Sequence, residues 1–216
     1  MALERFKRCE ELFGDEEFAK IQKAKIIILG VGGVGSYVLD CLYRSGISDI
    51  TIVDYDHYDI TNQNRQIGSE ALGELKTTRL KELYPNIRTI TQKIDIAWVE
   101  SFDFSPYALI IDACDTTKVK IELAKKEYKK LIMSVGSAKR FDASKIEVAS
   151  IWKTHGDALA SKIRTELKKA KFDRNFTVVF SGEAARCKEK GSFVGVTGSF
   201  GLMICSEAIK KILANK

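Results

Sequence analysis

A glycine-rich loop with an acidic residue downstream is the first feature of the sequence whose residue types and spacing can do chemistry. Gly30, Gly32 and Gly35 satisfy the GxGxxG spacing between an apolar run and a segment of helical pattern. Glycines at these places permit a tight turn and let the backbone approach phosphates, while the following helix N-terminus supplies positive potential. Asp54 ends the next apolar run, where its carboxylate can accept hydrogen bonds from ribose hydroxyls. The loop therefore predicts a nucleotide site and leaves open which nucleotide binds.

Polar residues after Asp54 favour a triphosphate over a dinucleotide. Asp56 lies two residues further on, Arg65 lies in the run NQNRQ, and Lys76 lies within a segment of helical pattern. Two cations just past a ribose-binding acid suit the high charge of ATP. Asp115 ends the run DACD after another apolar stretch, where a carboxylate can hold Mg²⁺ against the phosphates. The pattern favours ATP and Mg²⁺, so an NAD(P)-dependent oxidoreductase is the less favoured alternative.

Apolar runs alternate with helical patterns along the first 140 residues, and these elements must position the polar side chains. We expect strands at 25–29, 50–53, 90–94, 107–112 and 131–135, with helices at 3–13, 15–23, 37–43, 69–83 and 118–129. Such alternation predicts an α/β fold: a Rossmann-like, doubly wound, mostly parallel sheet with helices on both faces. Later strand patterns at 146–152 and 177–181 predict a C-terminal antiparallel extension. They flank a basic helix at 157–170 and precede an apolar-faced helix at 197–213.

The composition disfavours several other classes of protein. No stretch approaches the roughly 18 uncharged apolar residues that span a bilayer, and the charged N-terminus lacks an apolar signal core, so we expect a cytoplasmic location. Five scattered cysteines without a CxxC pair disfavour a disulfide framework and a structural zinc site. The first 108 residues carry 13 Lys/Arg and 17 Asp/Glu, whereas the last 108 carry 22 and 12. A basic second half suits a polyanion such as RNA, and a solvated lysine-rich surface explains it equally well.

These motifs together resemble the ubiquitin-activating-type adenylyltransferases. The shared pattern is GVGGVG, DYD, NQNRQ, a following lysine and DACD. The resemblance implies nucleotide or phosphate contacts from Gly30, Gly32, Gly33, Gly35, Asp54, Asp56, Asn62, Arg65, Lys76 and Asp115, with Asp115 as the magnesium ligand. It also implies that Arg8 reaches across the interface of a homodimer to the triphosphate in the other subunit. Thr116 stands where this family usually has Asn.

A closer resemblance covers nearly the whole chain and points to one branch of that family, the tRNA threonylcarbamoyladenosine dehydratases. It is carried by the N-terminal run RFKRCEELFG and by residues 136–146, 152–159 and 179–183. The resemblance implies that a carboxylate on the modified tRNA attacks the α-phosphorus of ATP and that cyclisation then releases AMP. Arg8, Arg65, Lys76 and Asp115 would form the catalytic set. The implied partners are the modified tRNA and a second copy of the chain, with a sulfur-transfer protein left open.

We expect a single ATP-binding adenylation domain over 1–216. Within it, an N-terminal helical arm covers about 1–23, a nucleotide-binding core about 24–136, and a substrate and dimer portion about 137–216. The main alternative applies the same chemistry to the C-terminus of a ubiquitin-like sulfur carrier, with Cys187 as the acyl acceptor. His57 and His155 fit turn residues better than acid–base catalysts.

Overall fold

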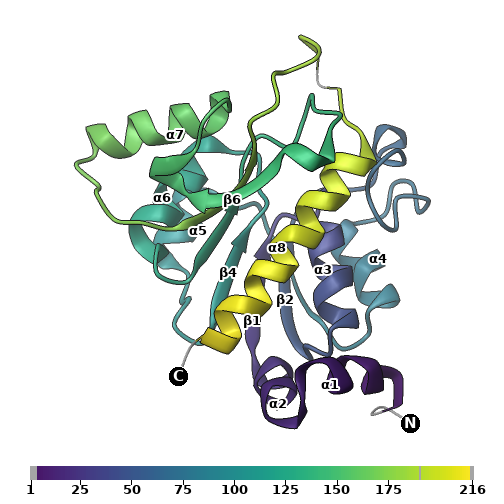
Figure 1. The fold of residues 1–216 in the computed structure, drawn as a ribbon. Helices are drawn as coiled ribbons and strands as arrows, with labels where there is room; N and C mark the ends of the chain where they lie inside the picture. Colours follow the sequence, from purple (N-terminus) through teal and green to yellow (C-terminus); the bar gives the residue numbers. More distant parts are fainter. Residues whose placement is uncertain (1–3, 190, 215–216) are drawn as a thin grey trace.

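Short apolar runs of the chain pair into one sheet in the computed structural model, which describes residues 4–189 and 191–214 (Figure 1). The strands of these residues are Lys25–Leu29 (β1), Asp49–Asp54 (β2), Arg88–Thr91 (β3), Leu109–Asp112 (β4), Leu131–Ser134 (β5), Ile146–Ser150 (β6) and Thr177–Ser181 (β7). Their order is β3-β2-β1-β4-β5-β7-β6. β6 pairs antiparallel with β7, and the other neighbours pair in parallel. The predicted parallel sheet with an antiparallel extension is confirmed.

Helices cover both faces of this sheet, as predicted. They are Lys7–Phe13 (α1), Asp15–Lys23 (α2), Gly35–Arg44 (α3), Lys76–Leu83 (α4), Ile96–Ser101 (α5), Thr117–Glu127 (α6), Ala158–Lys169 (α7) and Val194–Ala214 (α8). Successive strand residues point to opposite faces, so Ile26 and Ile28 of β1 pack with residues of α2, α3, α4 and α8. Ile27 and Leu29 pack instead with residues of α5, α6 and α7. A strand covered on both sides needs the continuous apolar run that KIIIL provides.

The order of the strands creates one place where ligands can enter. The chain runs from β1 outward through β2 and β3, then returns to β4 and continues outward through β5 on the other side. Helices therefore diverge above the carboxyl ends of β1 and β4, where doubly wound sheets bind their ligands. In register, Leu29 pairs with both Val53 and Asp112. The loops after β1, β2 and β4 consequently start side by side.

Several elements differ from their predicted bounds. The helix expected at 69–83 begins only at Lys76, because Gly73 adopts φ +79° and a right-handed helix needs a negative φ. The strand expected at 146–152 ends at Ser150, whose side chain accepts a hydrogen bond from Trp152 N in a 3₁₀ turn. Helix α5 was not predicted, although Asp95 caps it by accepting from Trp98 N at 2.8 Å.

Among the helices of residues 4–189 and 191–214, none combines the length and the apolar character that a membrane crossing requires.

Candidate nucleotide site

A cavity of about 900 Å³ lies at the carboxyl ends of β1, β2, β4 and β5. The predicted residues that line it are Gly30, Gly32, Gly33, Asp54, Asp56, Asn62, Arg65, Lys76 and Asp115. Sequence positions spread over 86 residues therefore meet in one place. Gly35 and Arg8 lie elsewhere.

The glycine loop needs glycine for reasons of space as well as conformation. Gly30 has φ +83°, and a Cβ added there would lie 3.0 Å from the carbonyl oxygen of Ala113. A Cβ on Gly35 would lie 1.9 Å from the carbonyl oxygen of Gly30, so Gly35 lets α3 begin directly against the loop. Gly33 lies beneath the aliphatic part of Arg65, since a Cβ added to Gly33 would lie 3.1 Å from Cγ and Cδ of Arg65. The loop backbone is thereby open to the cavity, next to the N-terminus of α3.

Asp54 is held rigidly at the edge of this loop. Its side chain is buried, and Oδ2 accepts a hydrogen bond from Val31 N at 2.8 Å while Oδ1 accepts from Asp56 N at 2.9 Å. Each carboxylate oxygen can accept more than one hydrogen bond, so both keep capacity for a ligand hydroxyl. The arrangement suits the predicted contact with ribose.

Lys76 is a buried cation at the first residue of α4. Its Nζ lies 3.2 Å from Oδ2 of Asp56, and its backbone N donates to the Asp56 carbonyl oxygen at 3.0 Å. The side chain is 6% exposed, whereas that of Asp56 is 48% exposed. Asp56 therefore orients the ammonium group, whose other N–H bonds can serve a phosphate. A direct contact of Asp56 with the nucleotide stays a prediction.

The 3₁₀ turn Ile60–Asn62 presents the next two polar residues. Asn62 Oδ1 accepts from Asp59 N at 3.2 Å and closes a capping box at the start of the turn. Arg65 Nη1 donates to the carbonyl oxygen of Thr61 at 2.8 Å and to Asn64 Oδ1 at 2.7 Å. These bonds fix one edge of the guanidinium beside the glycine loop. The position fits an anion with several oxygens.

Asp115 lies exposed on the loop between β4 and α6. The N-cap of α6 is Thr116, so Asp115 does not serve as the cap. Thr116 Oγ1 lies 3.3 Å from Asp115 Oδ1 and also lines the cavity. A carboxylate beside an anion-binding loop matches the donor set of Mg²⁺, which takes one or two carboxylates together with phosphate oxygens.

Sequence reasoning missed a buried ion pair beneath the cavity. Lys120 and Asp112 are both fully buried, with Nζ and Oδ2 3.1 Å apart. Lys120 Nζ also donates to the carbonyl oxygen of Ser134 at 2.9 Å, and Asp112 Oδ1 accepts from Cys114 N at 3.0 Å. The pair ties α6 to the ends of β4 and β5. The signal in the sequence was a lysine at a core-facing position of a helix.

A second buried pair that sequence reasoning missed lies at the other wall. Arg140 Nη2 and Asp157 Oδ2 are 3.1 Å apart, and both side chains are nearly inaccessible. Asp157 also caps α7 by accepting from Ala160 N at 2.6 Å. Beside Gly32 of the glycine loop, Gln66 Oε1 is buried and has no hydrogen-bond partner among the described residues, although Gln66 lines the cavity. Such an acceptor fits a donor from a bound ligand.

The cysteines of the described residues offer little support for a covalent role. Cys114 lines the cavity, but burial and the neighbouring Asp112 carboxylate raise the pKa of its thiol well above the usual value. A thiol with a raised pKa is a poor nucleophile. Cys187 is half-buried in the loop before α8, with Sγ 3.5 Å from the carbonyl oxygen of Glu189. His155 lies outside the cavity and pairs with Glu147 at 3.1 Å.

Arg8 is exposed on α1, near the amino ends of the strands, whereas the cavity lies at their carboxyl ends. Helix α1 lies against the C-terminal end of α3, where Cys9 Sγ contacts the carbonyl oxygen of Arg44 at 3.8 Å. Arg5 likewise lies over the ring of Tyr43, 4.9 Å from its centroid. The glycine loop is at the other end of α3. Arg8 therefore stands apart from the cavity of its own chain, and its role across a dimer interface stays a prediction.

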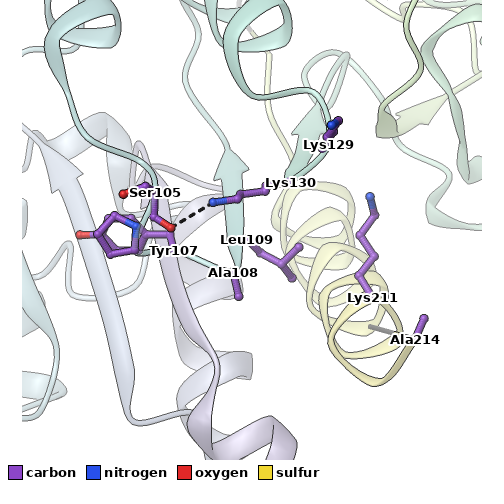
Figure 2. A pocket seen from close by; sticks show the side chains of 9 residues that line it. Ser105, Tyr107, Ala108, Leu109, Lys129, Lys130, Lys211 and Ala214 are labelled. Atoms are coloured by element: carbon purple, nitrogen blue, oxygen red, sulfur yellow. Dashed lines mark hydrogen bonds between the residues drawn. The ribbon is translucent and has the colours of Figure 1, made fainter. Parts of the chain in front are cut away.

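A second cavity of about 560 Å³ lies at the amino ends of β4 and β5, beside the end of α8 (Figure 2). Its lining includes Lys129, Lys130 and Lys211 and, among the described residues, no Asp or Glu. Lys130 Nζ donates to the carbonyl oxygen of Ser105 at 3.1 Å (Figure 2). Burial lowers the pKa of Lys211. Within the described chain, this cavity and the first share no lining residue.

Known proteins similar to this chain share its sequence over most of its length. The family model described as "ThiF family" matches residues 6–216. A tRNA threonylcarbamoyladenosine dehydratase from Bacillus subtilis is 36% identical over 193 residues, covering 84% of this chain and 76% of that protein. The protein of the same name from Haemophilus influenzae is 28% identical, covering 99% and 95%. A crystal structure of the E. coli tRNA N6-threonylcarbamoyladenosine dehydratase in complex with ATP superposes with a TM-score of 0.90 at 30% identity, covering 98% and 95%.

Proposed function

The chain belongs to the ThiF family, and on that premise we propose that it is an ATP-dependent dehydratase acting on threonylcarbamoyladenosine in tRNA. One observation of the structure carries the proposal. The glycine loop, the buried Asp54, the buried Lys76 and the carboxylate of Asp115 line a single cavity at the carboxyl ends of the parallel strands. This is an arrangement for a nucleotide with several phosphates rather than for a hydride carrier.

The proposed reaction has two steps. First, the carboxylate oxygen of the threonyl group attacks the α-phosphorus of ATP, the bond from that phosphorus to the bridging oxygen breaks, and pyrophosphate leaves. Second, a nucleophile within the same modification attacks the activated carbonyl carbon, and the C–O bond to AMP breaks. AMP carries away the oxygen atom, so the nucleoside loses one molecule of water. Because the substrate supplies its own nucleophile, the inert thiol of Cys114 is compatible with the reaction.

The protein residues in this scheme bind and orient. Asp54 accepts hydrogen bonds from the ribose, while Asn62, Arg65 and Lys76 donate to the phosphates as negative charge shifts toward pyrophosphate. Their side chains are held by their own hydrogen bonds, so little reorganisation is needed when the nucleotide arrives. Asp115 would hold Mg²⁺, and the ion when bound offsets the charge of the triphosphate.

A second copy of the chain is part of the proposal. Arg8 is exposed on α1 and separate from the cavity of its own chain, which leaves it available to the cavity of a partner subunit. A mixture of an Arg8→Ala subunit with an Asp115→Ala subunit would then regain activity in mixed dimers. If the mixture stays inactive while mixed dimers form, the shared site is wrong. A cytoplasmic location is part of the proposal because the proposed substrate is a tRNA.

The test is incubation of the protein with ATP, Mg²⁺ and tRNA that carries threonylcarbamoyladenosine, followed by mass spectrometry of the nucleosides. We expect ATP-dependent loss of one water from that nucleoside, abolished by Asp115→Ala and retained in Lys130→Ala, which alters the second cavity. An unchanged nucleoside, with pyrophosphate exchange only after addition of a ubiquitin-like sulfur carrier, would replace this proposal with the alternative adenylyltransferase.

A further inference from the structure

Two phenylalanine rings lie exposed side by side outside the nucleotide cavity. Phe141 is 59% exposed and Phe193 is 45% exposed. Their ring centroids are 5.8 Å apart with an interplanar angle of 25°, and the guanidinium carbon of Arg186 lies 4.9 Å from the centroid of the Phe141 ring. We call Phe141, Phe193 and Arg186 the aromatic platform. The two near-parallel rings and the guanidinium group therefore present flat surfaces to solvent.

The platform is assembled by contacts between distant segments of the chain. The Glu183 carboxylate accepts hydrogen bonds from Phe141 N at 3.0 Å and from Asp142 N at 2.9 Å, which hold the backbone under the first ring. The backbone N of Arg186 donates to the carbonyl oxygen of Lys139 at 3.0 Å. A Cβ on Gly195 would lie 2.4 Å from Phe193 Cε1, so the glycine lets the second ring lie against the start of α8. The segments that carry the rings are therefore fixed by hydrogen bonds between distant parts of the chain and by close packing at Gly195.

The aromatic platform adjoins the cavity. Arg140 and Ser192, the chain neighbours of the two phenylalanines, both line it. Asn64, which also contacts Arg65, donates from Nδ2 to the carbonyl oxygen of Ser192 at 3.0 Å. A long ligand with its reacting group in the cavity would therefore reach the platform where it leaves the cavity past Arg140 and Ser192.

Charge around the platform favours a nucleic acid over an apolar partner. Arg186 belongs to the platform itself, and Lys139, two residues before Phe141, lines the cavity, whereas the charge of Arg140 is neutralised in its buried pair with Asp157. Single-stranded RNA combines a phosphate backbone with unstacked bases, and proteins bind such bases on aromatic rings and arginine planes. An apolar protein surface would have to desolvate the guanidinium without compensation.

We propose that the aromatic platform stacks the nucleobase that neighbours the reacting adenosine in the tRNA chain. The proposal rests on the proposed function, because it assumes that a modified adenosine in RNA enters the cavity. The platform would bind the neighbouring base through its π face, which every base has, while the cavity binds the modification. Stacking then contributes to affinity for the RNA and leaves the binding of ATP unaffected.

The first experiment measures steady-state kinetics of the Phe141→Ala/Phe193→Ala variant. Loss of one stacked base raises KM for the modified tRNA about tenfold to a hundredfold, as expected for base–aromatic stacking. KM for ATP and kcat stay within about twofold, because the interaction is the same in the ground state and the transition state. Phe141→Trp retains the flat ring and is expected to keep a KM near that of the wild type. An unchanged KM for tRNA in the double alanine variant would overturn the proposal.

The second experiment reads stacking directly and does not depend on catalysis. An RNA stem-loop with 2-aminopurine beside the target adenosine, on one side or the other, is titrated with the wild-type protein. Stacking on a ring quenches the fluorescence of 2-aminopurine, so we expect quenching that the double alanine variant loses. Binding without quenching at either position, or no binding of the stem-loop, would contradict the platform. Failure of the proposed function alone would appear differently, as quenching without any loss of water from the modified nucleoside.

The third measurement addresses a second copy of the chain as the occupant. The molar mass of the wild type and of the double alanine variant is compared by light scattering. Equal masses are expected. A smaller mass for the variant would show that the rings pack against another subunit and would overturn the nucleobase assignment.

Discussion

The two cavities of this protein lie at opposite ends of the parallel strands of the sheet, and they differ in the residues that line them. At the carboxyl ends of the strands, acids and cations are interleaved, and several are buried, such as Asp54, Lys76 and Lys120. At the amino ends, the described lining contains lysines without acids (Figure 2). The first cavity is bordered by the N-terminus of α3, and the second by the C-terminal end of α8. The comparison separates two kinds of lining. The second cavity offers positive charge alone, whereas the first combines fixed, paired side chains with an open backbone loop, which is the combination that suits a nucleotide.

The largest expected difference between the two cavities concerns stability. Lys120→Met leaves the Asp112 carboxylate buried without its partner, which is expected to lower the free energy of unfolding by about 3–5 kcal/mol. Lys130→Met at the second cavity removes a partly exposed lysine that donates to the Ser105 carbonyl oxygen, and a cost below about 1 kcal/mol is expected. Urea unfolding of both variants measures the difference. Equal midpoints would show that the buried pair contributes no more than a surface lysine.

Catalysis should distinguish the cavities next. Lys76→Ala removes a preorganised donor to the phosphates, and a decrease in the rate of pyrophosphate release of about 10²–10³-fold is expected. Lys211→Ala changes a lysine of the second cavity and should leave that rate within about twofold. The assay is pyrophosphate release in the presence of the modified tRNA, with circular dichroism to confirm folding. Comparable losses in the two variants would mean that the first cavity is not the reaction site.

The glycine loop offers a smaller and more local test. Gly30→Ala forces φ +83° on a residue with a Cβ and places that Cβ 3.0 Å from the Ala113 carbonyl oxygen. Gly73→Ala has a similar φ of +79°, with nothing within 4 Å of the added atom. Both substitutions cost the left-handed strain of about 1–2 kcal/mol. Only Gly30→Ala also crowds the glycine loop, so only this variant is expected to weaken ATP binding. Isothermal titration with ATP compares them, and equal affinities would argue against close approach of the nucleotide to this loop.

The smallest expected effect concerns the partly buried Lys211. Burial lowers the pKa of this lysine in the folded state, so the unfolded chain binds the proton more tightly and protonation opposes folding. That penalty is fully present below the folded-state pKa and disappears as the pH rises through the ordinary value of about 10.4. Lys211→Met is therefore expected to raise the melting temperature slightly at pH 7, with the gain vanishing near pH 11. A gain that is independent of pH would assign the effect to packing.

Local patterns in the sequence were sufficient for the fold class and for many of the residues that line the candidate site. The run KIIIL, the glycine loop and the acidic residue ending the second strand each depend on neighbours in the chain, and each was found where predicted. Membership of the ThiF family and the class of adenylating enzyme, inferred by resemblance, are confirmed. The roles assigned to single residues, including Arg8 and Asp115, stay predictions, as does the single domain with its three portions.

What the sequence by itself determined is the set of elements and the chemistry available to them, because strand periodicity and glycine spacing act between near neighbours. What only the tertiary structure decided is which side chains meet. Lys120 contacts Asp112, Arg140 contacts Asp157, and Phe141 contacts Phe193 across 51 intervening positions of the chain. These contacts depend on how the helices pack on the sheet and where the loops cross. Burial then makes the two ion pairs obligatory, because a charge that has left water needs a partner.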